Sequence, residues 1–141
     1  MTIEEAFFAH LSADSGVAAV LGLRVYPTMA PQEVVDTWIK AERAYAIATY
    51  QVEARAEEQT HSGGLGIGST DFAMNVLHGT YKGARDAAVA IKAMVKGSAT
   101  LWGGLRVNRV AVAPSGTIDW NNDLLAFVAS VAFEVQHEKE T

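Results

Sequence analysis

Residues 70–97, TDFAMNVLHGTYKGARDAAVAIKAMVKG, decide the fold, because they predict a strand, a tight break and a helix in immediate succession. Every second residue of the first part lies on one face of the predicted strand: Phe72, Met74, Val76 and His78. After Gly79 the apolar residues recur at helical spacing: Ala84, Ala87, Ala88, Ile91, Met94 and Val95. We expect Thr80 to cap this helix and Gly97 to end it. A face of mostly alanine lets the helix lie close to a sheet.

Helices are also predicted in the N-terminal third of the chain. Residues 3–11 follow Thr2, with Glu5 three positions later, which is the capping-box pattern. Residues 17–21 add one or two helical turns that Gly22 ends. Pro31 favours the start of a short helix containing Trp38.

Strands are predicted at residues 23–27, 44–56, 105–112 and 124–136, in addition to the central one. The alternation over 44–56 predicts one buried face, as in antiparallel sheets. Between these strands we expect a mobile loop at 57–69, a loop at 98–104, a turn at 114–116 and a frayed tail from 137. Together they predict one α+β domain over residues 1–141, with a mostly antiparallel or mixed sheet of four to five strands flanked by two to three helices.

The composition limits the classes of protein that fit. The 141 residues are 50% hydrophobic and 19% charged, which excludes a mainly disordered chain. There is no cysteine, so disulfides and zinc–thiolate sites are impossible. No apolar run approaches the ~20 residues that span a bilayer, and Glu4 and Glu5 stand where a signal peptide would be basic. The net charge is −5 and the basic residues are scattered, so no nucleic-acid patch is predicted.

No pattern in the sequence predicts catalysis, a metal site or a cofactor. The stretch GGLGIG is similar to phosphate-binding loops but lacks the G-x-G-x-x-G spacing and a following helix. The four histidines form no metal-binding pair: we expect His10 and His78 at the core edge, and His61 and His137 exposed. The carboxylates of Glu57, Glu58, Asp119 and Asp123 are expected in solvated loops. Three tryptophans fit either a core or a subunit interface: Trp38, Trp102 and Trp120.

Three stretches, taken in order, resemble the tail-completion or tail-terminator proteins, a family of small neck proteins of long-tailed phages. They are the N-terminal helices with Gly22-Leu23-Arg24-Val25-Tyr26-Pro27, the strand–helix unit FAMNVLHGTYKGARDAAVAIKAMVKG, and the ending LLAFVASVAFEVQHEK. The segment 32–43 is longer than the usual link in that family, and the glycine-rich loop at 61–69 is unusually marked.

The resemblance implies a structural assembly protein and no enzyme. It implies a homo-oligomeric ring, expected to be a hexamer, that caps the tail tube, ends tube polymerisation and forms the interface to the head connector. Its partners would be itself, the major tail tube protein and a head–tail connector protein, with double-stranded DNA passing through the lumen without specific binding. It would lie in the tail neck of a phage, prophage or gene transfer agent virion, after synthesis in the host cytoplasm. The alternatives are a head–tail joining protein or, from another class, a small-molecule-binding α+β domain.

The glycine-rich loop is the candidate partner-contact site. Ordering glycine has a high entropic cost that nothing in the loop compensates within one subunit. We expect it to order on the tube end or on a neighbouring subunit, through Leu65 and Ile67. A plain connector between two strands is the alternative. The residues of this site are His61, Gly63, Gly64, Leu65, Gly66, Ile67 and Gly68.

Overall fold

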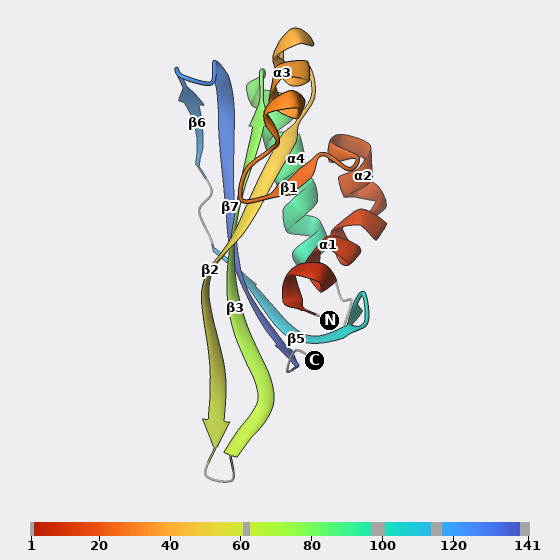
Figure 1. Ribbon diagram of the computed structural model, residues 1–141, viewed down its shortest axis with the longest axis vertical. Helices are drawn as coiled ribbons and strands as arrows, with labels where there is room; N and C mark the ends of the chain where they lie inside the picture. The colour runs from red at the N-terminus through yellow and green to blue at the C-terminus, as the bar shows by residue number, and fades with distance from the viewer. Residues whose placement is uncertain (1, 61–62, 97–100, 114–116, 139–141) are drawn as a thin grey trace.

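The computed structural model describes residues 2–60, 63–96, 101–113 and 117–138 (Figure 1). Its helices are α1 (Ile3–Ala13), α2 (Ser15–Leu21), α3 (Gln32–Lys40) and α4 (Tyr81–Lys96). Its strands are β1 (Val25–Pro27), β2 (Ile47–Thr60), β3 (Gly63–His78), β4 (Leu101–Trp102), β5 (Leu105–Val112), β6 (Ile118–Asn121) and β7 (Ala126–Glu138). The single α+β fold is confirmed.

The strands form one mixed sheet in the order β1-β2-β3-β7-β5-β4. Only β1 pairs in parallel, with β2, and every other pairing is antiparallel. β6 pairs with the first residues of β7, on the side where β5 pairs with its last residues. The described residues therefore hold seven strands and four helices, more than the four to five strands and two to three helices expected. The extra strands β4 and β6 lie in segments expected to be loops.

The main core lies between one face of the sheet and helices α1, α2 and α4 (Figure 1). The ring of Phe7 is at its centre, 4.9 Å from the ring of Phe72 and 5.6 Å from that of Phe133, measured between centroids. All the apolar residues expected on the inner face of α4 are buried: Ala84, Ala87, Ala88, Ile91, Met94 and Val95. The strand–break–helix prediction is thereby confirmed.

A smaller cluster occupies the opposite face of the sheet at one end. Trp38 of α3 packs there with Ile47 and Ala126, and its indole N–H donates to the Tyr45 carbonyl at 2.7 Å. The prediction that β2 has one buried face is wrong at this end, because Trp38 covers the second face. The expectation that α3 begins after Pro31 is confirmed.

The caps predicted at Thr2 and Thr80 are confirmed by hydrogen bonds, whereas α2 begins at Ser15, two residues before its predicted start at Val17. Thr2 and Glu5 form the complete capping box of α1. Asp14 caps α2 by accepting from the Val17 N–H at 2.9 Å. The Thr80 hydroxyl accepts from the Gly83 N–H at 3.1 Å and so caps α4. The expected end at Gly97 lies outside the described residues.

Strands β2 and β3 form a long hairpin that extends past the helical layer (Figure 1). The prediction of a loop over residues 57–69 is wrong for 57–60 and 63–69, since β2 continues to Thr60 and β3 begins at Gly63, and residues 61–62 lie outside the described part. Pairing explains the difference: Gly63, Gly64 and Gly68 all have partners on β2. Backbone hydrogen bonds across the hairpin oppose the weak strand preference of glycine.

The last strand also runs beyond its predicted end. β7 continues to Glu138, so the expectation of a frayed tail from residue 137 is wrong for His137 and Glu138. His137 was expected to be exposed, yet only 3% of its surface is accessible. It lies between β3 and β5, where it pairs with Gly68 and Val107.

Candidate functional site

The glycine-rich candidate site lies at the far end of the β2–β3 hairpin. Residues 63–68 form the start of β3, and only His61 falls outside the described residues. β7 reaches this strand only as far as Ile67, which pairs with Glu138. Within the part of the chain that the structure describes, residues 63–66 are therefore paired with β2 alone. The segment is a strand paired to a strand, an arrangement unlike the strand–turn–helix of a nucleotide-binding loop.

Gly68 is required by the buried histidine beside it. A Cβ atom at this position would lie 2.9 Å from His137 Cε1. His137 Nδ1 lies 2.7 Å from the Glu138 carbonyl, which can only accept, so Nδ1 carries the hydrogen. Nε2 therefore accepts from the Thr70 hydroxyl at 2.9 Å. The side-chain bond from Thr70 to His137 joins β3 to β7 where the hairpin leaves the body of the molecule.

The sheet face opposite helices α1, α2 and α4 is polar beyond the Trp38 cluster. Asn75 and Ser130 are neighbours on it, and the serine hydroxyl donates to the Asn75 amide oxygen at 3.0 Å. Farther along, Asp71 and Glu134 stand directly opposite each other, and both line a shallow pocket with Glu53. We call Glu53, Asp71 and Glu134 the carboxylate row. Like charges across a strand pair are destabilising, so the three carboxylates do not serve the stability of the sheet and point to a functional role of this face.

The sequence contains a signal for the carboxylate row, namely the polar positions that alternate with the core residues of β2, β3 and β7. What the sequence lacks is the register that brings them side by side. That register is set by the pairing of Asp71 with Ala54 and Glu134 and by a β-bulge after Val52.

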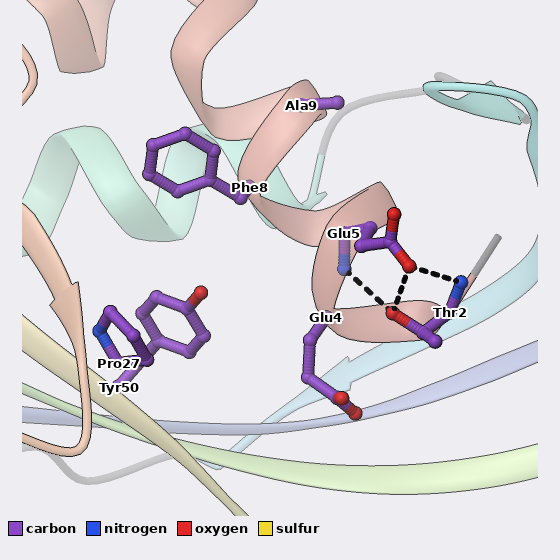
Figure 2. A pocket seen from close by; sticks show the side chains of 7 residues that line it. All are labelled: Thr2, Glu4, Glu5, Phe8, Ala9, Pro27 and Tyr50. Atoms are coloured by element: carbon purple, nitrogen blue, oxygen red, sulfur yellow. Dashed lines mark hydrogen bonds between the residues drawn. The ribbon is translucent and has the colours of Figure 1, made fainter.

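A pocket of about 540 Å³ lies between the start of α1 and the edge of the sheet (Figure 2). Phe8 of α1 stands opposite Pro27 and Tyr50, and Glu4 points toward the sheet. Burial raises the pKa of Tyr50, and the Glu4 carboxylate adds to the rise. Hydrogen bonds from Thr2 lower the pKa of Glu5, so this carboxylate is already engaged in the helix cap.

A second pocket, of about 410 Å³, lies on the opposite face of the sheet, against Trp38 at the end that α3 covers. Large apolar side chains are exposed around it, among them Met29 at 76% and Leu125 at 52%. Leu125 and Thr28 both have positive φ although neither is glycine. Backbone strain of this kind clusters at functional sites. This end is a second surface suited to partners.

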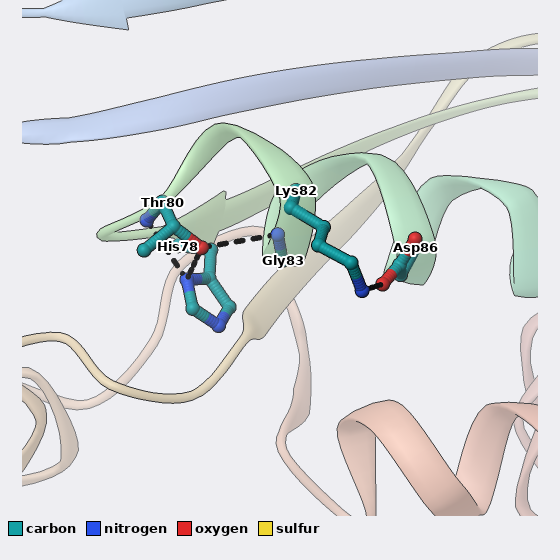
Figure 3. Close-up of polar contacts among 5 residues, drawn as sticks. All are labelled: His78, Thr80, Lys82, Gly83 and Asp86. Atoms are coloured by element: carbon teal, nitrogen blue, oxygen red, sulfur yellow. Dashed lines mark hydrogen bonds and ion pairs between the residues drawn. The ribbon is translucent and has the colours of Figure 1, made fainter.

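His78 closes the turn between β3 and α4 (Figure 3). Its Nδ1 accepts from the Thr80 backbone N–H at 3.0 Å, and its ring lies where a Cβ of Gly83 would be. Burial lowers the pKa of His78, while the charge of Asp86 opposes that shift. Asp86 itself has a lowered pKa because it accepts a hydrogen bond from Lys82 at 2.8 Å. These contacts stabilise the start of α4.

The other histidines and tryptophans have structural positions. His10 stacks on Trp102 with centroids 5.0 Å apart, at the edge of the core as expected. Trp38 and Trp102 are buried, and Trp120 is 47% exposed on β6. Among the described residues no three metal-ligating side chains gather, and no helix in that part of the chain is long and apolar enough to cross a membrane.

Several solved structures share this fold. A chain described as part of the virion of a native gene transfer agent (GTA) particle superposes with a TM-score of 0.68 at 17% sequence identity, covering 96% of this chain and 94% of that one. A second chain, whose name describes no function, superposes with a TM-score of 0.55 at 17% identity, covering 99% and 95%. No protein-family model and no curated protein matches the sequence. At these identities the likeness establishes a common fold over nearly the full length of all three chains.

Proposed function

We propose that this protein is a tail terminator, a structural subunit that closes as a ring on the end of a phage or gene-transfer-agent tail tube. The ring, a hexamer in this proposal, ends tube polymerisation and offers a surface to the head connector. The observation that carries the proposal is the fold shared with a chain of a gene transfer agent virion over 96% of this sequence. The order of motifs that resembles tail-completion proteins gives independent support from the sequence.

The charge of the polar sheet face supports the passage of DNA through such a ring. The carboxylate row of Glu53, Asp71 and Glu134 would repel phosphate. The cations of α4 lie on the helical side: Lys82, Arg85, Lys92 and Lys96. We assign the polar face to the lumen, where DNA must slide without being held.

The β2–β3 hairpin is the part that we assign to the tube. It reaches past the helices, so its end can contact another molecule before the body of the subunit does (Figure 1). Among the described residues, 63–66 have a partner strand on one side only, and the other side can accept a further strand. The contact residues proposed here are those of the glycine-rich site, with Leu65 and Ile67 as the apolar anchors.

A shortened hairpin tests this function. Residues 58–67 are replaced by Asn-Gly, which makes a two-residue turn between the paired residues Glu57 and Gly68. The variant is added to tail tube protein during assembly, and tube lengths are measured by electron microscopy. We expect uncapped tubes of uncontrolled length, with a melting temperature close to that of the wild type. Wild-type protein should give tubes of one length that join heads.

The control alters the pocket at α1 and leaves the hairpin intact. Phe8→Ala changes an exposed side chain there, and it should leave tube length normal. If tubes end at the normal length with the shortened variant, the end of the hairpin only connects β2 to β3 and has no role in capping. Tubes that are unaffected by wild-type protein at any concentration would refute the tail-terminator function.

A further inference from the structure

The sheet ends in two free edges. β1 covers β2 only at residues 48–50, so within the described residues the side of β2 that faces away from β3 has no partner strand from Gln51 onward. At the other end β4 covers only Leu105 and Arg106 of β5. From Val107 to Val112 the outer side of β5 has no partner strand in the described part of the chain. Free edges of this length are sites for pairing with another chain.

The two edges carry opposite charge. Residues 51–60 of β2 contain Glu53, Arg55, Glu57 and Glu58, a net charge of −2. The free part of β5, residues 107–112, contains Arg109 and no acidic residue, a net charge of +1. Pairing of identical edges would bring like charges together, whereas pairing of unlike edges brings opposite charges together. The charges therefore favour a head-to-tail contact between copies, the type that can close into a ring.

The strand directions suit the same contact. Antiparallel pairing from β2 through β3 and β7 to β5 leaves β2 and β5 running in opposite directions. Copies related by rotation about an axis along the strands would thus place β5 antiparallel to the next β2. Arg109 pairs with Gln136, two residues after Glu134, so it lies on the polar face. Glu53 borders that face as well, because it lines the pocket with Glu134.

We propose that the free edge of β5 in one subunit pairs antiparallel with the free edge of β2 in a second copy, with Arg109 opposite Glu53. Within the described residues the side chain of Arg109 has no hydrogen bond or ion pair, and the carboxylate of Glu53 accepts only a 3.4 Å bond from Gln51. Both side chains are exposed and free to meet. This inference rests on the proposed ring and names the surface that closes it.

Disulfide trapping tests the contact directly, because the natural chain has no cysteine. Gln51→Cys and Ala111→Cys place one thiol on each edge, both at exposed positions of the polar face. Within one subunit β3 and β7 separate these strands by about 14 Å, three strand spacings. Cysteines whose Cα atoms are more than about 7 Å apart cannot join, so every disulfide must link two copies. We expect a ladder of linked oligomers that stops at the ring number.

The matched control pairs Gln51→Cys with Val89→Cys, an exposed position on α4 away from both edges. This pair should give no ladder beyond a background of dimers. Equal ladders from both pairs would overturn the contact. So would the absence of a ladder from the edge pair, provided that native mass spectrometry shows the variant still forms the ring.

Charge exchange gives a second test that needs no cross-link. Arg109→Glu or Glu53→Arg alone should raise the concentration at which the ring dissociates about tenfold, and the double variant should restore it. Arg85→Glu on α4 should have no effect, since Arg85 is exposed far from the edges in sequence and on the helical side. A ring insensitive to both exchanges overturns the edge pairing while leaving the tail-terminator function intact. A wild-type protein that forms no ring, even on tail tubes, overturns both.

Discussion

The backbone N–H of Gly79 donates to the carbonyl of Arg43 at 2.9 Å, and a Cβ atom on Gly79 would lie 2.8 Å from that same oxygen. The turn between β3 and α4 is thus fitted directly against the loop between α3 and β2. Glycine is needed at this position because of a close approach by another backbone, and its own φ is not positive.

Replacing Gly79 with alanine should therefore destabilise the protein by about 1–3 kcal/mol, since two backbone segments must move apart. Gly16→Ala is the contrasting variant, because its Cβ would meet only the Asp14 carboxylate oxygen, at 3.2 Å. A shift of this side chain by a few tenths of an ångström relieves the contact and keeps its bond to the Val17 N–H, so a smaller loss is expected. Urea unfolding of both variants measures the difference, and equal losses would contradict the assigned contact.

Ala88→Phe should overpack the inner face of α4 and cost about 1–3 kcal/mol, because Ala88 is only 7% exposed. The same substitution at Ala93, an exposed position on the same helix, should change stability by about 0.5 kcal/mol or less. Thermal melting of the two variants compares identical chemistry on the two faces. Similar melting temperatures would mean that the helix does not pack as described.

Thr70→Val should cost about 1–3 kcal/mol, because it leaves the buried Nε2 of His137 without its donor. Thr49→Val is the control, a half-buried threonine on the polar face of the same sheet. It should be close to neutral in denaturant unfolding. A neutral result at Thr70 would show that the hydroxyl does not hold His137.

Stability should fall as pH decreases through the titration of His78. Burial lowers the pKa of this histidine from its ordinary value of 6.5, so the unfolded chain binds the proton more readily than the folded one. The contribution is complete above pH 6.5 and is lost as pH falls through the folded-state pKa. Protonation also removes the acceptor of the Thr80 N–H and places a positive charge at the start of α4.

The variant His78→Asn isolates this effect from the other histidines. Its amide oxygen can accept the same hydrogen bond and does not titrate. The unfolding free energies of wild type and variant are measured from pH 8 to pH 5. As pH falls, the wild type should lose more unfolding free energy than the variant does. A difference that is constant with pH would rule out His78 as the titrating group.

The elements that the sequence predicts well are those whose periodicity is set within the element. The inner face of α4 and the capping box at Thr2 need no knowledge of the rest of the fold. β6 was not predicted because the four residues of IDWN are too few to show alternation, and their strand conformation depends on pairing with β7. The same holds for β4, which contributes one buried tryptophan, Trp102.

The candidate site shows the same limit more sharply. A segment with four glycines at 63–68 predicts a loop, and only its register with β2 makes it a strand. His137 looks like part of a polar tail, and only the pairing of β7 with β3 and β5 buries it. The carboxylate row likewise exists only after three strands are aligned. Long-range register is the information that a single sequence does not display.

Arg43 makes further hydrogen bonds in addition to its contact with Gly79. Its N–H donates to the Trp38 carbonyl, its carbonyl accepts from Gly79, and its Nε donates to the Leu124 carbonyl at 2.8 Å. Three turns that are distant in sequence are therefore tied to one residue, which itself has a φ of 55°. Amide hydrogens in these turns should exchange with solvent together, with one shared opening free energy. The end of the molecule opposite the hairpin would then open as a unit.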